Sequence, residues 1–536
     1  MSLTYPIAFV IVAVSVVLSI YISFYFRKQS RTASSFFVAG GEIPWKINGL
    51  AMFGDYCSAA SFLGVAGAIA IVGIDGWWLA LGFFATWMAV LFLIAGPLKN
   101  TGKFTVGDVI SERFGKSKDI RTIAMITTLV LTSLYLVPQI VGAGHLFKLL
   151  LGWNYAVTVV VSGALITFLV IIGGMKGTTF NQAIQGIVLL GAMLLLLFSS
   201  AALFYKGNIF NIITTGKKVV PTVIAAKEAS DIVENAPDAK AAVEAVRSAM
   251  PTAPGALTPG VGLRDFANHM SLVLGLFVGV LGLPHILIRF YTVKSAKAAQ
   301  KSIEFTIWGL AIFYTAVLFV GLAIMYILYP ELVELVVSGK RGLATNMAVP
   351  MLGQRIGGEL FLGLIAAGAL AAMLSTCTGL LITATTSIAH DLYASIFRPE
   401  SSDEERVSFA KKAVIVLAVV SILLAIWLKS QNVGMLVGMS FGIAASTFAP
   451  AIVLTVWWKR LTKQGVVIGM AAGLLVSLIF TFARFFKLKA FIGIPVLVNP
   501  ALYSVPVAFF VFIIVSLMTK DVGKVEEFMA MAHQKK

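Results

Sequence analysis

Long runs of hydrophobic residues with few charges recur along the whole chain. The hydrocarbon core of a bilayer is about 30 Å thick, and about 20 apolar residues in a helix cross it. The first run follows no basic stretch and precedes no obvious cleavage site, so we expect it to be retained as a helix. The pattern predicts an all-α polytopic membrane protein. Its thirteen predicted membrane helices lie near residues 6–26, 47–72, 76–97, 122–147, 155–174, 182–204, 266–288, 303–329, 359–388, 411–428, 433–457, 464–483 and 501–518.

Composition supports this fold class and gives no indication of an enzyme. Of the 536 residues, 59% are hydrophobic and only 12% are charged, which lies far outside the range of soluble domains. The sequence contains no Gly-rich phosphate loop, nucleophile elbow or kinase signature. Cys57 and Cys377 both fall within predicted spans, so no disulfide framework is indicated.

The charged residues indicate how the chain is oriented in the membrane. The formal net charge is +17, and most Lys and Arg residues fall in loops that are cytoplasmic if the N-terminus is outside. Cytoplasmic loops of membrane proteins carry an excess of Lys and Arg. We therefore expect a multi-pass protein of the cell (inner or plasma) membrane with its N-terminus outside and its C-terminus in the cytoplasm. Its surroundings are then membrane lipid, and nucleic acid is not an expected partner.

Two of the predicted spans contain residues that interrupt a helix. The second span contains GDYCSAASFLG (54–64), and the seventh lies in GLFVGVLGLPHILIRF (275–290). They occupy corresponding positions in two halves of five spans each. Interrupted helices in such positions point to an inverted repeat with the binding site at the breaks.

The second span carries the residues that most need a functional explanation. An aspartate at the centre of a membrane helix costs about 2.5–3.5 kcal/mol, so Asp55 is expected to face the bundle interior, water or a cation. Gly54, Ser58, Ser61 and Gly64 let the backbone leave helical geometry, which frees carbonyls for a cation and amides for an anion. The alternative is that these small residues, at near-helical spacing, only allow helices to pack closely.

The ninth span contains AAMLSTCTG (371–379), which places Ala372, Ser375 and Thr376 on adjacent turns of one helix face. Hydroxyl and carbonyl oxygens suit a hard cation such as Na⁺. Alone, the motif is weak, because Ser and Thr commonly bond back to their own helix.

The five histidines give no indication of a zinc site. None has another His, Cys or carboxylate at metal-ligand spacing. His390 and Asp391 are adjacent in a predicted helix, and we expect them to face apart.

Four ordered motifs together resemble the sodium:solute symporter family, and the first is most similar to its acetate/monocarboxylate permease branch. They are FFVAGGEIPWKINGLAMFGDYCSAASFLG, GGMKGTTFNQAIQG, GLPHILIRFYT and AAMLSTCTGLLITATTSIAHDLY. The resemblance implies a LeuT-type fold with a 5+5 inverted-repeat core, one helix before the core and two after it. We accordingly expect an extra N-terminal helix and basic loop at 1–35, a transporter core at 36–460 with repeats at about 47–204 and 266–457, an extracellular or periplasmic loop at 205–265, and two helices with a short cytoplasmic tail at 461–536.

Carried over residue by residue, the resemblance implies a sodium site. Its ligands would be the main-chain carbonyls of Gly54, Cys57 and Ala372 and the hydroxyls of Ser375 and Thr376. The expected activity is import of a small monocarboxylate, acetate first, driven by an inward Na⁺ gradient, with Na⁺ as the coupling ion. The substrate is expected between the two broken spans, near Asp55, Ser58, Ser61, Gly279 and Gly282.

Two departures from the family pattern leave alternatives open. Proline-type relatives place the acid one position later, where this chain has Tyr56, and they have a second acid where this chain has Gln182. Coupling to protons therefore stays open. Gln182, Pro284 and His285 are expected to have gating or structural roles. Pyruvate, lactate, propionate and proline stay open as substrates, a transporter-like sensor or a channel as function classes, and a small membrane subunit as a partner.

Overall fold

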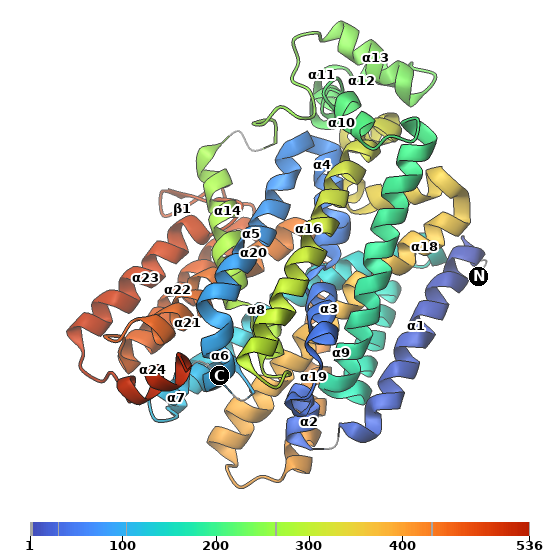
Figure 1. The fold of residues 1–536 in the computed structure, drawn as a ribbon. Helices are drawn as coiled ribbons and strands as arrows, with labels where there is room; N and C mark the ends of the chain where they lie inside the picture. The colour runs from blue at the N-terminus through green and yellow to red at the C-terminus, as the bar shows by residue number, and fades with distance from the viewer. Residues whose placement is uncertain (1–3, 31, 103, 263–264, 430–432, 535–536) are drawn as a thin grey trace.

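The computed structural model describes residues 4–30, 32–102, 104–262, 265–429 and 433–534. In this part of the chain, eleven helices are long and apolar enough to cross a membrane. They pack side by side into one bundle (Figure 1). Apolar side chains are exposed on its outer helices, with Val10 58%, Val14 63% and Leu423 62% exposed, as expected of a surface that faces lipid. The predicted class, an all-α polytopic membrane protein, is confirmed.

The helices before the large insertion are α1 (Pro6–Phe26), α2 (Ala33–Val38), α3 (Trp45–Tyr56), α4 (Ala66–Val72), α5 (Trp78–Ala89), α6 (Ala95–Thr101), α7 (Val106–Arg113), α8 (Lys118–Leu151) and α9 (Tyr155–Phe204). The insertion forms α10 (Phe210–Gly216), α11 (Thr222–Glu228), α12 (Ser230–Glu234) and α13 (Ala239–Ala249). The helices after it are α14 (Phe266–Gly279), α15 (Pro284–Leu287), α16 (Ala296–Ile327), α17 (Tyr329–Val337), α18 (Arg341–Ser387), α19 (Asp403–Trp427), α20 (Val433–Ser446), α21 (Phe448–Trp457), α22 (Lys463–Phe485), α23 (Ala501–Met518) and α24 (Val525–Ala532).

Short segments of other geometry join these helices. The 3₁₀ segments are η1 (Arg27–Gln29), η2 (Ala39–Gly41), η4 (Gly73–Trp77), η6 (Val280–Gly282) and η7 (Ile288–Phe290). The π-helical segments are η3 (Ala60–Val65), η5 (Val90–Ile94) and η8 (Ile388–Phe397). One small antiparallel hairpin pairs β1 (Ala490–Phe491) with β2 (Ile494–Pro495).

The eleven helices correspond to the thirteen predicted spans in a specific way. The helix α9 contains two predicted spans, because two helices meet at Gly174 (φ 54°, ψ −164°). The stretch 60–101 covers the second half of the second span and all of the third, which are separated at Gly73 (φ 73°). Both points are glycines with positive φ, where other residues are strained. The division into thirteen crossings stays a prediction.

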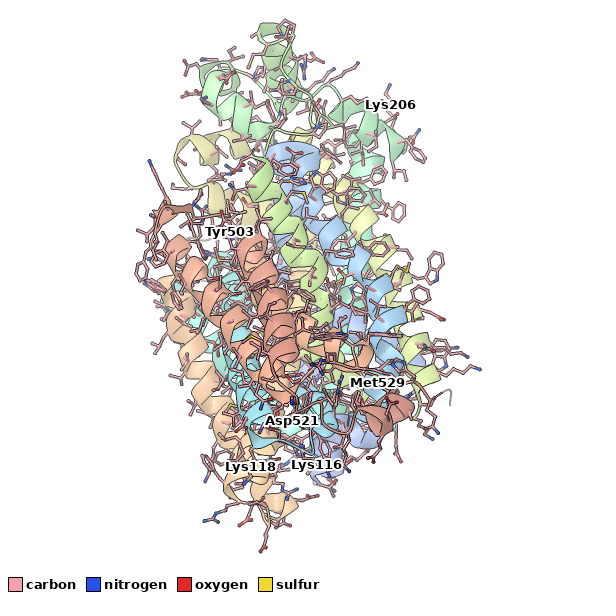
Figure 2. All side chains as sticks on the ribbon, turned by 90° about the vertical axis from the view of Figure 1, so that its left-hand side faces the viewer. Lys116, Lys118, Lys206, Tyr503, Asp521 and Met529 are labelled. Carbon is pink, nitrogen blue, oxygen red and sulfur yellow. The ribbon has the colours of Figure 1, made fainter. Side chains whose placement is uncertain are left out.

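The insertion that we expected as a loop folds into helices α10–α13, which cap one end of the bundle (Figure 1). Hydrogen bonds attach this cap to the bundle: the Tyr329 hydroxyl donates to the carbonyl of Val220 (2.8 Å), and the Thr222 hydroxyl donates to that of Ala70 (2.7 Å). The C-terminal helix α24 and the neighbouring α7 lie at the opposite end. Figure 2 shows Lys116 and Asp521 at that end and Lys206 near the cap.

Both helices that the sequence predicts to be broken are broken. The helix α3 ends at Tyr56, Cys57 has a non-helical ψ of 83°, and the chain resumes as the π-helical segment η3. In the second break, Leu283 is extended (ψ 105°) between η6 and α15. Pro284 follows it, and a proline disfavours helical geometry in the residue before it.

Glycine allows the broken helix to approach α9 closely. A Cβ on Gly54 would overlap with the carbonyl oxygen of Gln182 and would lie 3.0 Å from the backbone nitrogen of Gly186. Both of these neighbours are backbone atoms, which cannot rotate away. The contact therefore fixes the distance between α3 and α9 at the position of the break.

We expect Gly54→Ala to lower the thermal unfolding temperature of the purified protein, because overpacking costs about 1–3 kcal/mol. The matched control is Gly191→Ala in α9, where an added Cβ meets nothing within 4 Å and alanine favours the helix. Equal unfolding temperatures for the two variants would contradict the close-contact explanation.

Candidate ion-binding site

The break at the end of α3 leaves carbonyl oxygens without a helical partner, and hydroxyl groups of α18 donate hydrogen bonds to them. The last carbonyls of a helix have no partner within the helix. The hydroxyl of Ser375 lies 2.5 Å from the carbonyl oxygen of Gly54 and 2.9 Å from that of Ala372, and the hydroxyl of Thr376 donates to the carbonyl of Asp55 (2.6 Å). All five residues are buried. The structure thus brings together four of the five predicted sodium ligands.

The fifth, Cys57, lies at the break itself. Its N–H still bonds to the carbonyl of Phe53 (3.0 Å), but its own carbonyl accepts no backbone N–H from the residues that the structure describes. The non-helical ψ explains this, since it turns the carbonyl out of the helical ladder. The role of Cys57 as a ligand stays a prediction.

A buried ion pair lies next to these oxygens, and the sequence analysis did not identify its cationic member. The Nε of Arg289 lies 3.4 Å from Oδ2 of Asp55, and both side chains are 0% exposed. Arg289 also donates to the hydroxyl of Thr179 (2.6 Å) and to the side-chain carbonyl of Gln182. The available signal was an arginine inside an apolar motif, GLPHILIRFYT, because charges at such depth need a partner.

Gln182 joins the ion pair to the helix α18. Its amide nitrogen donates to the carbonyl of Ser375 (2.8 Å) while its amide oxygen accepts from Arg289. On the other side of the pair, Oδ1 of Asp55 has no hydrogen-bond partner among the described residues. A Cβ on Gly379 would overlap with that oxygen, so only a glycine lets the carboxylate lie against α18. A buried, unpartnered carboxylate oxygen beside freed carbonyls fits a site for a cation.

The predicted substrate residues Ser58 and Ser61 lie at the start of η3. Ser61 and Tyr314 share a hydrogen bond between their hydroxyls (2.9 Å), and the Ser58 hydroxyl accepts from the N–H of Ala60 (3.2 Å). The N–H of Ala59 donates to the side chain of Gln139 (2.9 Å). Tyr314 and Gln139 were not predicted, because periodicity does not reveal which distant side chains meet.

Aromatic rings surround this end of the break. Tyr56 packs against Trp87 (ring centroids 5.0 Å apart), and its hydroxyl donates to the carbonyl of Phe83 (2.6 Å). Phe441 lies 5.0 Å from Phe83 and 5.6 Å from Tyr135. These rings form one aromatic cluster next to the break.

The other predicted residues belong to the second break. A Cβ on Gly279 would lie 2.5 Å from the carbonyl oxygen of Phe441, and one on Gly282 would lie 2.5 Å from that of Ala444. These glycines allow close packing on α20, and their contact with substrate stays a prediction. His285 is buried, its ring lies 5.3 Å from Tyr135, and neither ring nitrogen has a partner among the described residues. The gating role predicted for Pro284 and His285 is likewise untested.

A second polar cluster corrects one expectation. His390 and Asp391 do not face apart: His390 bonds to Asp108 (3.0 Å), and Arg121 bonds to both Asp108 (2.8 Å) and Asp391 (3.2 Å). Adjacent side chains diverge by only about 100° on a helix, and Asp108 from α7 and Arg121 from α8 connect the two into one cluster. Burial raises the pKa of Asp108, but the hydrogen bond and charge of His390 together with Arg121 outweigh it and lower the pKa below its ordinary value. Arg121 already supplies the cation here.

Comparisons with known proteins show which family and which fold the chain resembles. The family model described as "Sodium:solute symporter family" matches residues 36–473. A relative from Bacillus subtilis (strain 168), "Uncharacterized symporter YwcA", is 37% identical over 474 residues, which cover 88% of this chain and 85% of the relative. Among solved structures, an outward-open, substrate-bound Na⁺-coupled sialic acid symporter has a TM-score of 0.72 at 18% identity, covering 96% of this chain and 98% of its own. A closed nucleobase-cation-symport-1 family transporter, Mhp1, has a TM-score of 0.53 at 13% identity, covering 94% and 99%.

The buried pair predicts a characteristic pattern of stability. Asp55→Asn and Arg289→Gln should each destabilise the protein by about 3–5 kcal/mol, because each leaves an uncompensated buried charge. The double variant should be more stable than either single variant, measured as thermal unfolding in detergent. As a control, Glu244→Gln removes an exposed pair with Lys240 and should have little effect. Additive losses in the double variant would contradict mutual compensation.

Proposed function

The chain belongs to the sodium:solute symporter family, and on that premise we propose that it imports a small monocarboxylate, most simply acetate, together with Na⁺ by alternating access. The family and the structural neighbours are transporters and not enzymes. The observation that carries the proposal is the meeting of the freed carbonyls of Gly54 and Asp55 with the hydroxyls of Ser375 and Thr376. The proposed fold is LeuT-type, with thirteen crossings, a 5+5 core, and the cap outside the cell.

The donor set favours Na⁺ as the coupling ion. The proposed ligands are all neutral oxygens: the carbonyls of Gly54, Cys57 and Ala372 and the hydroxyls of Ser375 and Thr376. Hard cations prefer such oxygens. The nearby carboxylate of Asp55 retains one oxygen without a partner, which provides negative charge beside the proposed cation.

Charge explains how one ion can couple to one anion. The charges of Asp55 and Arg289 cancel, so this pair adds no net charge to the region of the break. A bound Na⁺ would make the site positive, and a carboxylate would restore neutrality. Charges at such short range interact far more strongly in a low-dielectric interior than in water. Each ligand therefore favours binding of the other.

The surroundings favour a small anion. Ser58, Ala59, Ala60 and Ser61 start the segment after the break, where the positive end of the helix dipole favours negative charge. The N–H groups of Ala59 and Ala60 are already bonded within the protein, so the hydroxyls of Ser58 and Ser61 are the groups proposed to meet the anion. Aromatic rings including Phe83 and Phe441 occupy the adjoining space. A two-carbon carboxylate suits small residues on one side and rings on the other.

Uptake of radiolabelled acetate into proteoliposomes tests the proposal. An inward Na⁺ gradient should drive accumulation, a pH gradient alone should not, and excess unlabelled acetate should block uptake. Pyruvate and proline serve as competitors. Accumulation of a competitor in place of acetate would contradict acetate as the substrate, whereas the assignment as a symporter would still hold.

The cation site makes a separate prediction. Ser375→Ala and Thr376→Ala should raise the Na⁺ concentration for half-maximal uptake about 10-fold or more, because each removes an oxygen worth roughly 1.5–3 kcal/mol toward a charged partner. Substrate affinity at saturating Na⁺ should change less.

The control is Thr386→Ala on the same helix, whose hydroxyl bonds only one turn back, to the carbonyl of Ile382 (2.6 Å). It should keep the Na⁺ dependence of the wild type. Unchanged Na⁺ dependence in all three variants would show that Ser375 and Thr376 do not bind the cation and that its site lies elsewhere.

A further inference from the structure

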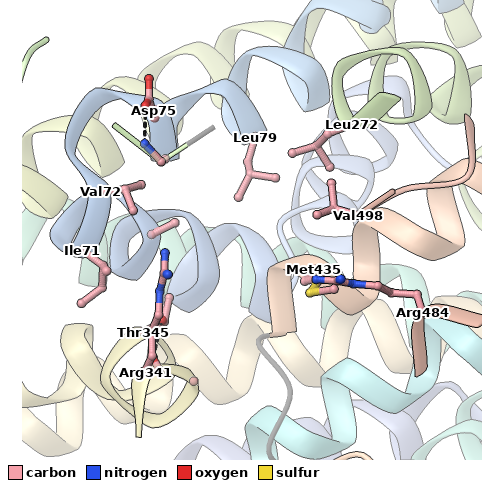
Figure 3. A pocket seen from close by; sticks show the side chains of 14 residues that line it. Ile71, Val72, Asp75, Leu79, Leu272, Arg341, Thr345, Met435, Arg484 and Val498 are labelled. Carbon is pink, nitrogen blue, oxygen red and sulfur yellow. Dashed lines mark hydrogen bonds between the residues drawn. The ribbon is translucent and has the colours of Figure 1, made fainter. Parts of the chain in front are cut away.

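A cavity of about 440 Å³ is lined by residues of α4, α5, α14, α18, α20 and α22 and of adjoining segments. Figure 3 shows it beside α4, with Arg341 and Arg484 extending from different walls. Much of the remaining lining is apolar, including Leu79, Leu272 and Val498. This cavity has no part in the ion site described above.

The two arginines have no acidic partner in the part of the chain that the structure describes. The ion pairs found there involve neither Arg341 nor Arg484. The acidic residue in the lining, Asp75, is engaged elsewhere: its two oxygens accept from the backbone N–H groups of Gly260 (3.0 Å) and Gly262 (2.6 Å). The cavity therefore presents two uncompensated guanidinium groups.

Helix stability does not explain the position of Arg341. It is the first residue of α18, and a cation at a helix N-terminus is unfavourable because that end of the helix is itself positive. Arg484, in the last turn of α22, is favourably placed with respect to its helix. Arg341 is exposed and Arg484 is partly buried, so both guanidinium groups can meet a dissolved anion.

The cavity and the break are joined by one continuous stretch of helix, η3 followed by α4. Ala68, in its lining, is seven residues after Ser61, about 10 Å along a helix. Between them, Gly64 meets α20, where a Cβ would lie 3.1 Å from the backbone nitrogen of Gly434. Thr345 of the lining packs by its carbonyl against Gly67. The segment between the break and the cavity is thus packed closely against α20 at Gly64 and against α18 at Gly67.

We propose that this cavity is an outer binding site in which Arg341 and Arg484 hold the carboxylate of the incoming substrate before it passes to the break. The inference rests on the proposed function for its substrate class. Guanidinium groups bind carboxylates in a planar, often bidentate geometry, and the excess positive charge of a cavity with two arginines against one aspartate raises the local concentration of anions. The cavity is much larger than a small carboxylate and partly apolar, so binding here is weak and fast.

Transport kinetics provide the first test. Arg341→Gln and Arg484→Gln should each raise the KM for acetate about three-fold, and the double variant about ten-fold, through lost electrostatic concentration of the anion. The maximal rate and the Na⁺ dependence should stay as in the wild type. Lys340→Gln is the matched control, since Lys340 is exposed beside Arg341 but does not line the cavity. A KM in the double variant equal to that of the control would overturn the proposal and leave the proposed function standing.

A binding measurement keeps the two proposals separable. Saturation-transfer NMR of acetate with the purified protein in Na⁺-free buffer reports on the outer site, because the inner site is proposed to need Na⁺. The signal should be present in the wild type and in Ser375→Ala, and lost in Arg341→Gln/Arg484→Gln. An absent wild-type signal, or an equal signal in the double variant, would overturn the outer site whatever the result of the uptake assay.

Discussion

A charge buried inside a membrane protein needs a partner close by, and the organisation of this site follows from that constraint. Asp55 on the broken helix and Arg289 beside the second break are both wholly buried and compensate each other. Their contact links the two interrupted regions of the chain, 234 residues apart. Because the pair is neutral, the break can receive a cation without first losing one, and the added positive charge then favours an anion.

The backbone supplies the other half of the site. The end of α3 at Tyr56 leaves carbonyls without helical partners, and the hydroxyls of Ser375 and Thr376 take them up. Glycine makes this possible at two points: Gly54 allows α3 to approach α9, and Gly379 leaves space for the Asp55 carboxylate. The close packing at the glycines, the freed carbonyls and the buried carboxylate of Asp55 therefore depend on one another.

The sequence predicted the features that depend on local pattern and missed those that depend on distant contacts. Apolar runs located the membrane helices, and glycine, serine and proline located both breaks, because these residues act on their own backbone. The pairing of Asp55 with Arg289 was missed, since periodicity does not show which distant charges meet. The cluster of His390 and Asp391 was also missed, because it is connected by Asp108 and Arg121, which lie much earlier in the chain. The helical start of α18, before the glycine pair 357–358, was missed because it is not apolar enough to resemble a span.

Equilibrium binding of ²²Na⁺ to the purified protein, measured with and without saturating acetate, shows whether the cation and the anion are coupled through charge. Coupling between two ligands is reciprocal. We expect saturable ²²Na⁺ binding. Its affinity should increase about 5-fold or more when acetate is present, which is within the usual range of such coupling. An affinity for ²²Na⁺ that is the same with and without acetate would contradict it.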